Sequence, residues 1–414
     1  MGKIVQKFGG TSVADVTRIR RAALKVKKTI EEGNQVAVVV SAMAGVTNQL
    51  VGYCREISPS FDNSFDWREY DAVVASGEQV TAGLMALALQ EIGVKARSWQ
   101  GWQVALQTDS AHGRARINAI SCELLEKALA DGEVPVVAGF QGISDEGRIT
   151  TLGRGGSDTS AVALAAALKA DRCDIYTDVD GVYTTDPRIV SKARKIRRIT
   201  YEEMLEMASL GAKVLQTRSV ELAMNHHVRV QVLSSFDDLS AGALPGTMVV
   251  DEDEIVEQQI VSGIAYSRDE AKITLVKVQD RPGVAAQVFG PLTAANINVD
   301  MIVQNISLED HRTDITFTLS RADLDRAIQV LELAKEKISF EGVVAHADVV
   351  KISVIGVGMR SHVGVAQTMF QSLADKGINI QVITTSEIKV SVLIAEEYTE
   401  LALRTLHTAY GLDV

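Results

Sequence analysis

The segment KIVQKFGGTSVADVTRIR, residues 3–20, runs from an apolar stretch through two glycines and two hydroxyl residues into a stretch of helical period. A strand that turns directly into a helix is the repeating unit of a mostly parallel sheet covered by helices. In such sheets ligands gather at the carboxyl ends of the strands. Lys7 would supply charge there, and Gly9 and Gly10 lack the Cβ atoms that would keep an anion from the helix N-terminus. The segment therefore predicts an anion site, with a plain tight turn capped by Ser12 as the alternative.

The same alternation of short β-rich runs and longer helical stretches continues to about Ser234, which predicts an α/β domain over this part of the chain. The expected strands are 3–8, 35–41, 134–138, 173–177 and 228–233. The expected helices are 13–32, 70–92, 115–130, 159–169 and 211–225.

The strongest local motif is LGRGGSDTS, residues 152–160, which leads directly into the helical sequence AVALAAALKA. Three glycines around Arg154, closing on Ser157 and Asp158 at a helix start, suit a loop that wraps a phosphate or a carboxylate. Neither this loop nor the first turn matches the GxxxxGK[ST] phosphate loop, the dinucleotide GxGxxG motif or the protein-kinase motifs. These three classes of nucleotide-binding protein are therefore excluded.

Residues 177–188, TDVDGVYTTDPR, follow an expected strand and combine acids, turn residues and one aromatic side chain. They suit a site for a base, a ribose or Mg²⁺, but an acidic surface hairpin has the same composition. Three other polar residues have equally ordinary alternatives: Ser41 as a helix cap, Glu78 as an exposed helix carboxylate and Lys213 as a solvated charge.

Composition and charge restrict the class of protein. The 414 residues predict two or three domains, and 46% hydrophobic with 23% charged residues predict a chain that folds throughout. A formal net charge of −11 gives no electrostatic case for a nucleic-acid or anionic-membrane partner. The strongest apolar run, 36–46, is shorter than the roughly 20 residues of a membrane span. Three scattered cysteines and histidines without metal-ligand spacing lead us to expect a cytoplasmic protein without a metal site.

The last third of the chain contains an internal repeat. With an offset of 81 residues (364 − 283 = 81), GVAAQVFGPLTAANINVDMI from Gly283 aligns with GVAQTMFQSLADKGINIQVI from Gly364. Each copy predicts a strand, a loop, a helix and two further strands, a βαββ unit whose free sheet edges or face suit association with another copy. The loop before the helix is the expected ligand position, because the helix N–H groups face it.

Together the motifs KFGGTSV, GRGGSDTSA, TDVDGVYTTDPR and GAKVL, followed by the repeat, resemble the aspartate kinase family over nearly the whole chain. The resemblance implies a three-layer α/β amino-acid-kinase domain with a mostly parallel central sheet over residues 1–245 and a linker over 246–262. It then implies two α+β ferredoxin-like ACT domains over 263–344 and 345–414, between which this family can exchange strands. The length leaves no room for a fused homoserine dehydrogenase, so we expect a monofunctional enzyme.

The resemblance also implies the reaction: transfer of the γ-phosphoryl group of ATP, with Mg²⁺, to the β-carboxylate of L-aspartate, the first step of lysine, threonine and methionine biosynthesis. That carboxylate is already ionised at neutral pH, so no general base is needed. The implied catalytic residues are Lys7 and Asp158. Arg154 would bind the α-carboxylate of aspartate and Glu78 its ammonium group, with Ser41, Thr47 and Ser157 as neighbours. The nucleotide would be held by Lys7, Gly9, Gly10, Ser12, Thr177, Asp178, Tyr183, Arg188 and Lys213.

The paired ACT domains imply feedback inhibition by lysine, threonine or both. One implied effector site comprises Asp280, Gly283, Ala285, Gln304, Asn379 and Ile380. A second comprises Asp300, Ser386 and Glu387, where an acidic pair suits a lysine ammonium and two surface acids are the alternative. A homo-oligomer formed through the ACT domains is also implied, and a shorter regulatory chain, with Met248 as a candidate start, stays open.

Two rival functions stay open at this point. A non-enzymatic amino-acid sensor could retain the kinase fold as a scaffold, although intact Lys7, Arg154 and Asp158 count against it. A kinase for another small amino-acid carboxylate, such as glutamate, would carry the same Arg154 and Glu78. These residues do not determine the substrate's length, so the family resemblance alone favours aspartate.

Overall fold

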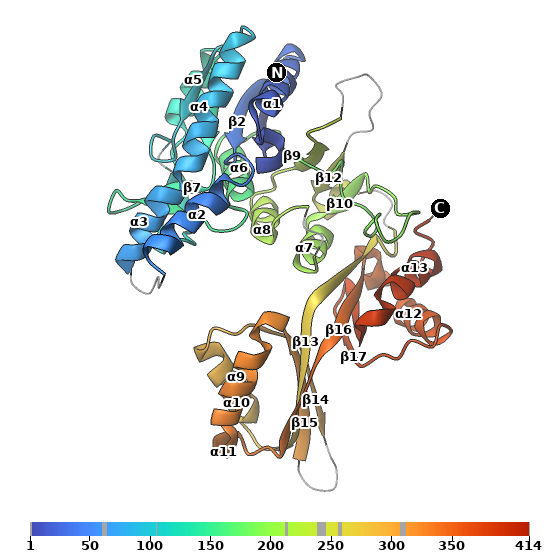
Figure 1. The fold of residues 1–414 in the computed structure, drawn as a ribbon. Coiled ribbons are helices and arrows are strands. Elements are labelled where there is room, and N and C mark those ends of the chain that lie inside the picture. The colour runs from blue at the N-terminus through green and yellow to red at the C-terminus, as the bar shows by residue number, and fades with distance from the viewer. Residues whose placement is uncertain are drawn as a thin grey trace. The chain divides into compact units, whose positions relative to one another are not determined.

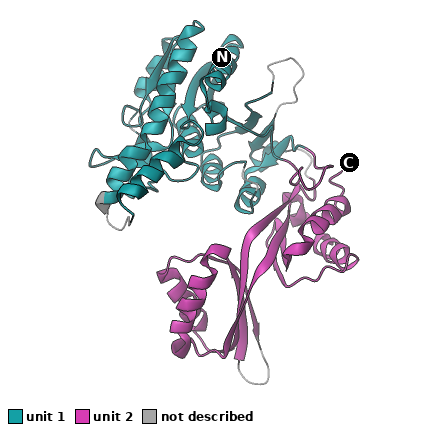
Figure 2. Ribbon diagram, viewed as in Figure 1, with its two compact units in different colours: residues 1–182, 195–257 teal, residues 183–194, 258–414 magenta. Residues whose placement is uncertain are grey.

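A computed structural model describes residues 2–59, 64–104, 106–211, 214–237, 246–255, 259–306 and 312–413. The chain divides into two compact units, shown in teal and magenta in Figure 2. Unit 1 comprises residues 1–182 and 195–257, and unit 2 comprises residues 183–194 and 258–414.

Unit 1 is built on an eight-stranded sheet of order β10-β12-β11-β9-β1-β2-β6-β3. Figure 1 labels four of its strands, β2, β9, β10 and β12. Neighbouring strands pair in parallel except β11 and β12, which confirms the expected mostly parallel sheet. The central strands are buried along almost their whole length, as parallel strands covered on both faces are. The bounds are β1 (Lys3–Phe8), β2 (Gln35–Val40), β3 (Ala96–Trp99), β6 (Val134–Ala138), β9 (Arg172–Thr177), β10 (Arg198–Thr200), β11 (Val230–Ser234) and β12 (Thr247–Val250).

Helices cover both faces of this sheet, because alternate residues of each strand point to opposite sides. Phe8 and Val40 lie in one hydrophobic cluster with residues of α1 and α4. Lys7 and Val39 point to the other face, where α6 begins. The helices of unit 1 are α1 (Val16–Glu31), α2 (Val46–Ile57), α3 (Ser64–Val74), α4 (Ser76–Glu91), α5 (Glu123–Ala130), α6 (Gly156–Ala167), α7 (Tyr201–Ser209) and α8 (Thr217–Asn225).

A second sheet of unit 1 has four short strands in the order β5-β4-β7-β8, which the sequence analysis did not predict. Residues 115–130, predicted as one helix, contain β5 followed by α5, because β5 pairs antiparallel with β4, a partner that local periodicity does not reveal. The predicted helix 70–92 is likewise two helices, α3 and α4, separated at Ala75. The strands are β4 (Leu106–Thr108), β5 (Ile117–Ile120), β7 (Gln141–Ser144) and β8 (Ile149–Thr151).

Helices α3 and α4 together, Asp66–Glu91, are long and apolar enough to cross a membrane by length and composition alone. Half of the qualifying window is buried within the protein, where α4 contributes Ala82, Met85 and Leu89 to the core cluster. This burial matches a core helix of a folded domain, and the apolar side chains serve packing against the sheet.

Residues 246–262, predicted as a linker, begin with a strand of the first sheet. β12 pairs with β10 and, antiparallel, with β11. Thr247 is fully buried, and its Oγ1 accepts a hydrogen bond from Val182 N at 2.7 Å and donates to Ile196 O at 2.6 Å. The apolar side chains of Val249 and Val250 are also fully buried, so burial favours a strand here over a linker.

Unit 2 is built on a six-stranded antiparallel sheet of order β14-β15-β13-β16-β18-β17. The expected βαββ order of both repeats is confirmed, with helices α10, α11 and α13 added at their ends. The first repeat contains β13 (Gly263–Gln279), α9 (Val284–Ala294), β14 (Val299–Ile306), β15 (Arg312–Leu319), α10 (Leu324–Leu333) and α11 (Lys335–Ile338). The second contains β16 (Gly342–Ile355), α12 (Val365–Ala374), β17 (Val382–Thr385), β18 (Lys389–Ala395) and α13 (Thr399–Ala409).

The long strands β13 and β16 each contribute to both repeat cores. In β13, Ile264 packs with the helices of the second repeat, whereas Ile273 packs with those of the first. In β16, Val343 packs against the first cluster and Ile352 lies in the second. Strands are therefore exchanged between the repeats, and a boundary between residues 344 and 345 does not separate two cores.

Residues 183–194 leave unit 1 and pack in unit 2. The Oγ1 of Thr184 lies 2.9 Å from His407 Nε2, and its backbone carbonyl accepts a hydrogen bond from Ile264 N at 2.7 Å. Val190 joins the hydrophobic cluster of the second repeat. The chain then re-enters unit 1 at Lys195.

Candidate active site

Strand β1 lies between β9 and β2 in the sheet, so the carboxyl ends of these three strands are adjacent. The strands that follow in sequence lie on opposite sides of β1, which makes this the topological switch point of the sheet. Gly9 N donates to Tyr176 O at 3.2 Å, which joins the first turn to the end of β9. Ser41 N donates to Phe8 O at 3.0 Å, which joins the end of β2 to the end of β1. This is the position at which open α/β sheets bind ligands.

Lys7 and Asp158 form an ion pair at this edge. Lys7 Nζ lies 2.5 Å from Asp158 Oδ1, and the two side chains are only 10% and 11% exposed. Asp158 lies in the first turn of α6, where a carboxylate also favours the helix N-terminus. A Cβ at Gly9 would lie 3.2 Å from Lys7 Nζ, so the glycine leaves room beside the ammonium group. The pair fixes a positive charge next to the glycine turn.

Ser12 does not cap α1, because Asp15 takes that role by accepting a hydrogen bond from Arg18 N at 2.8 Å. Instead Ser12 Oγ lies 2.5 Å from Ser235 Oγ and donates to Tyr176 O at 3.2 Å. Ser235, which the sequence analysis missed, follows the end of β11 directly. Its position two residues after the expected strand 228–233 was the available signal.

Glu78 is a buried residue of α4, only 3% exposed, so the alternative of an exposed helix carboxylate is wrong. Its Oε1 accepts a hydrogen bond from Ala42 N at 3.0 Å, and its Oε2 has no hydrogen-bond partner among the residues the structure describes. Burial raises the pKa of Glu78 to about 7, and the hydrogen bond from Ala42 opposes the shift. One oxygen is therefore left for another donor.

Three further predicted residues lie close to this edge. Ser41 is not a helix cap, since Gly45 precedes α2 in that position. Thr47 lies in the first turn of α2, which packs against Gly77, the residue before Glu78. Ser157 is buried in the first turn of α6, 3.0 Å from where a Cβ of Gly139 would lie at the end of β6. The structure thus brings all three toward Lys7 and Glu78.

The loop 152–156 requires its glycines. Gly153 and Gly155 have φ angles of 76° and 73°, in the left-handed region that side chains disfavour. Space adds a second constraint, because a Cβ at Gly155 would overlap the side chain of Gln216. Arg154 is exposed and has no hydrogen bond or ion pair among the described residues. The loop holds its backbone tightly while leaving the guanidinium group available.

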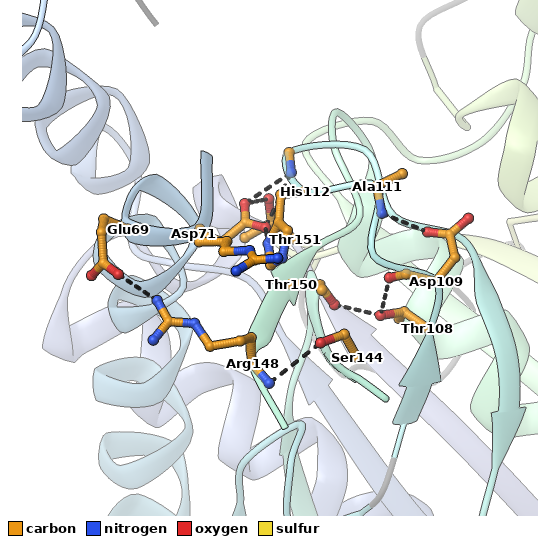
Figure 3. Close-up of polar contacts among 12 residues, drawn as sticks. Glu69, Asp71, Thr108, Asp109, Ala111, His112, Ser144, Arg148, Thr150 and Thr151 are labelled. Atoms are coloured by element: carbon orange, nitrogen blue, oxygen red, sulfur yellow. Dashed lines mark hydrogen bonds and ion pairs between the residues drawn. The ribbon is translucent and has the colours of Figure 1, made fainter. Parts of the chain in front are cut away.

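Two sets of side chains that the sequence analysis missed support this loop. Arg218 of α8 donates to Leu152 O and to Ala115 O, both at 2.9 Å. Asp71 of α3 receives hydrogen bonds from Thr151, His112 and Gly113 (Figure 3). Their partners lie 41 to 103 residues away in sequence, so no local motif marks them.

The predicted nucleotide residues are divided between the two units. Thr177 and Asp178 end β9 beside the first turn, and Thr177 Oγ1 donates to Asp178 Oδ1 at 3.1 Å. Tyr183 and Arg188 belong to unit 2, where Arg188 Nη2 pairs with Asp186 Oδ2 at 2.8 Å. Lys213 lies outside the described residues.

Three members of the first predicted effector set, Asp280, Gly283 and Ala285, lie at the start of α9. Gly283 precedes that helix with φ of 88°, and Gly364 precedes α12 with φ of 94°, which explains why the repeat keeps a glycine there. Asp280 and Ala285 are exposed on either side of Gly283. The remaining members are Gln304 on β14 and Asn379 and Ile380 before β17.

The second predicted effector set contains an acid that is already paired. Asp300 Oδ2 accepts from Lys351 Nζ at 2.6 Å, and the same ammonium lies 2.7 Å from Glu270. Burial by itself would raise the pKa of Asp300. The hydrogen bond from Lys351 and the positive charges of Lys351 and Lys389 outweigh it, so the pKa is lowered. Ser386 and Glu387 are exposed, with Glu387 3.6 Å from Arg360.

Three domain models match the chain. Residues 2–234 match the amino acid kinase family, and residues 272–332 and 352–410 match ACT domains. The first span covers most of the parallel-sheet unit, and the other two lie within the two repeats of the antiparallel-sheet unit.

Full-length relatives carry the same arrangement. The aspartate kinase of Stutzerimonas stutzeri (strain A1501) is 55% identical over 414 residues, covering 100% of this chain and 98% of that protein. The crystal structure of E. coli aspartokinase III in complex with aspartate and ADP (R-state) matches with a TM-score of 0.77 at 29% identity, covering 98% and 99% of the two chains. The same enzyme in complex with lysine and aspartate (T-state) gives a TM-score of 0.75 at 29% identity, covering 98% of both. The chain therefore belongs to the aspartate kinase family, as an amino acid kinase domain followed by two ACT domains.

Proposed function

We propose that this chain transfers the γ-phosphoryl group of ATP to the β-carboxylate of L-aspartate, giving 4-phospho-L-aspartate, and is controlled by amino acids bound to its ACT domains. The aspartate and ADP in the E. coli complex support this choice of substrates. The observation that carries the proposal is the Lys7–Asp158 pair, 2.5 Å long, at the same strand ends as a buried glutamate that has one oxygen without a partner among the described residues. The ammonium group of Lys7 suits a phosphate, and the carboxylate of Glu78 suits the ammonium group of an amino acid.

The main barrier is repulsion between two anions, the carboxylate nucleophile and the γ-phosphate. Lys7 would offset the charge that the transferred group carries in the transition state, while Asp158 holds the lysine in place. The amides of the Gly9–Gly10 turn and of the α6 N-terminus would add partial positive charge. These residue types meet the needs of phosphoryl transfer without a histidine base.

Substrate recognition would use Glu78 and Arg154. The free Oε2 of Glu78 would accept a hydrogen bond from the ammonium group, which would also favour the ionised carboxylate. The available guanidinium of Arg154 would bind the α-carboxylate through two hydrogen bonds. Both contacts recognise the amino-acid end, so the aspartate assignment rests on the family.

ATP use accords with membership of a kinase family, and we assign Mg²⁺ as the accompanying ion. Among the described residues no group of three His, Cys, Asp or Glu side chains could hold a metal. Mg²⁺ fits this donor set, because it is commonly held by substrate phosphates, water and one or two carboxylates, of which Asp158 is the candidate here. When bound, the ion would neutralise phosphate charge.

Regulation would act through lysine, threonine or both. The lysine in the T-state E. coli complex supports an amino-acid effector. The set around Gly283 is the better candidate, because Asp300 in the second set is neutralised by Lys351. We also propose a cytoplasmic homo-oligomer formed through the ACT domains, supported by the unpaired sheet edges at β14 and β17. A shorter regulatory chain stays a prediction.

Acyl-phosphate trapping with hydroxylamine tests the catalytic and regulatory proposals together. The full chain is offered ATP and Mg²⁺ with L-aspartate or L-glutamate, with and without lysine plus threonine. Turnover of aspartate alone that falls with the effectors is the expected result. Turnover of glutamate would overturn the substrate, and activity unchanged at saturating effector would overturn the regulation.

A further inference from the structure

We propose that Asp71 is a positioning residue for the loop that carries Arg154, and that it acts on aspartate binding without touching the substrate. This inference rests on the proposed role of Arg154 in binding the α-carboxylate. Asp71 lies near the end of α3 and is 0% exposed. Complete burial of a carboxylate is costly, and the mechanism above does not use this one, so its contacts must account for it.

Asp71 collects donors from two separate segments (Figure 3). Thr151 Oγ1 donates to Oδ1 at 2.5 Å. The backbone N–H of Gly113 lies 3.0 and 3.1 Å from the two oxygens, and His112 Nδ1 lies 2.7 Å from Oδ2. Because each donor must point at the same buried group, the carboxylate fixes the end of β8 relative to the loop 109–116.

Both segments border the residue before Arg154. Thr151 precedes Gly153 by two positions, and its carbonyl accepts a hydrogen bond from Ala115 N at 2.9 Å. A Cβ at Gly153 would lie 3.2 Å from Gly113 O, so the two segments are in contact where the loop turns. A displacement of Gly113 or Thr151 would therefore shift the backbone that carries Arg154.

Arg154 depends on this backbone because nothing else in the described chain holds its side chain. Arg218 joins the same segments from the other side by donating to Leu152 O and Ala115 O. Asp71 thus accepts hydrogen bonds from both segments, and Arg218 donates hydrogen bonds to backbone carbonyls of both. We expect weaker Asp71 contacts to loosen substrate binding more than they affect the Lys7–Asp158 pair, because Lys7 lies on β1, outside both segments.

The variants separate positioning from general stability. Thr151→Val removes the hydroxyl donor while keeping shape and charge, and Thr151→Ser restores a donor. Asp71→Asn presents an amide group where the buried donors require an acceptor. Glu69→Gln is the matched control, because Glu69 lies on the same helix and accepts from Arg148 Nη2 at 2.5 Å, outside the Asp71 network (Figure 3).

Steady-state kinetics of the full chain is the test, with thermal unfolding measured in parallel. We expect Thr151→Val to raise KM for aspartate about tenfold and Asp71→Asn to raise it further, with kcat and KM for ATP changed less than about twofold. Thr151→Ser and Glu69→Gln should resemble the wild type. If Asp71→Asn does not fold, the two Thr151 variants decide.

Two failures are distinguishable. A wild-type chain that turns over aspartate, with Thr151→Val lowering only the unfolding temperature or kcat, would overturn the positioning role alone. A wild-type chain that does not turn over aspartate would overturn the proposed function on which the inference rests.

Discussion

Two buried carboxylates on consecutive helices, Asp71 of α3 and Glu78 of α4, are satisfied to opposite degrees. Asp71 is 0% exposed and receives hydrogen bonds from a hydroxyl, an imidazole and a backbone amide. Glu78 is 3% exposed, but only Oε1 has a hydrogen bond among the described residues. Because a buried polar atom without a partner costs free energy, the first region supports the fold while the second carries a cost that a ligand can remove. Asp71 therefore stabilises the protein around the site, whereas Glu78 is available to bind the substrate.

Removing Lys7 should have the largest effect on the catalytic activity of the site that also contains Glu78. Lys7→Met leaves Asp158 buried without its partner and removes the charge facing the γ-phosphate, so kcat should fall by about 1,000-fold or more. Acyl-phosphate trapping measures kcat, and circular dichroism checks the fold. Lys3→Met, at the other end of β1, is the control and should retain activity. Near-normal turnover of Lys7→Met would contradict the assigned site.

The cost of burying Glu78 should appear in the pH dependence of stability. Its pKa rises from 4.5 to about 7 in the folded state, so the stability gained from the protonated carboxyl is complete below pH 4.5 and is lost as pH rises through 7. Relative to Glu78→Gln, the wild type should lose on the order of 3 kcal/mol between these limits. Urea unfolding of both proteins at pH 5 and pH 8 measures this difference in the free energy of unfolding. If the free energy of unfolding changes equally with pH in both proteins, burial does not raise the pKa of Glu78.

The same substitution should weaken aspartate binding. Glu78→Gln keeps the shape but removes the charge that would meet the ammonium group, so KM for aspartate should rise about 30-fold while KM for ATP stays unchanged. Glu91→Gln, an exposed position at the end of α4, is the matched control. An equal loss in both KM values would point to general damage instead of a specific contact.

A smaller effect sharpens the comparison further. Because only ionised Glu78 would bind the ammonium group, KM for aspartate should fall about tenfold from pH 6 to pH 8 in the wild type. The profile should be flat in Glu78→Gln. A pH dependence that survives this substitution would assign the titration to another group.

The sequence was sufficient to predict those structural features that depend on residues adjacent in the chain. The strand 3–8, its glycine turn and the loop 152–160 were predicted because an apolar run, glycines and a helix start are all local signals. Sequence could not show that Glu78 is buried, because α4 is apolar around most of its surface. Asp71, Arg218 and Ser235 were missed because their partners lie far away in the chain.

Membership of a unit was equally hard to predict. Residues 183–188 belong to the same motif, TDVDGVYTTDPR, as Thr177 and Asp178, yet they pack in unit 2. A hydrogen bond between Thr184 and His407 and one from Tyr266 to Asp186 hold them there. The predicted Tyr183 and Arg188 contacts to the nucleotide stay predictions.

The shared strands β13 and β16 limit how this regulatory region can be inherited. A gene fragment that begins at residue 345 would encode α12 and α13 without the segment of β13 that contains Ile264, which packs in the same core. Recombination must therefore move both repeats together to conserve either core. An internal translation start such as Met248 preserves β13 and β16, whereas any start inside β13 does not. The two repeats therefore form one structural module, although each has its own copy of the repeated sequence.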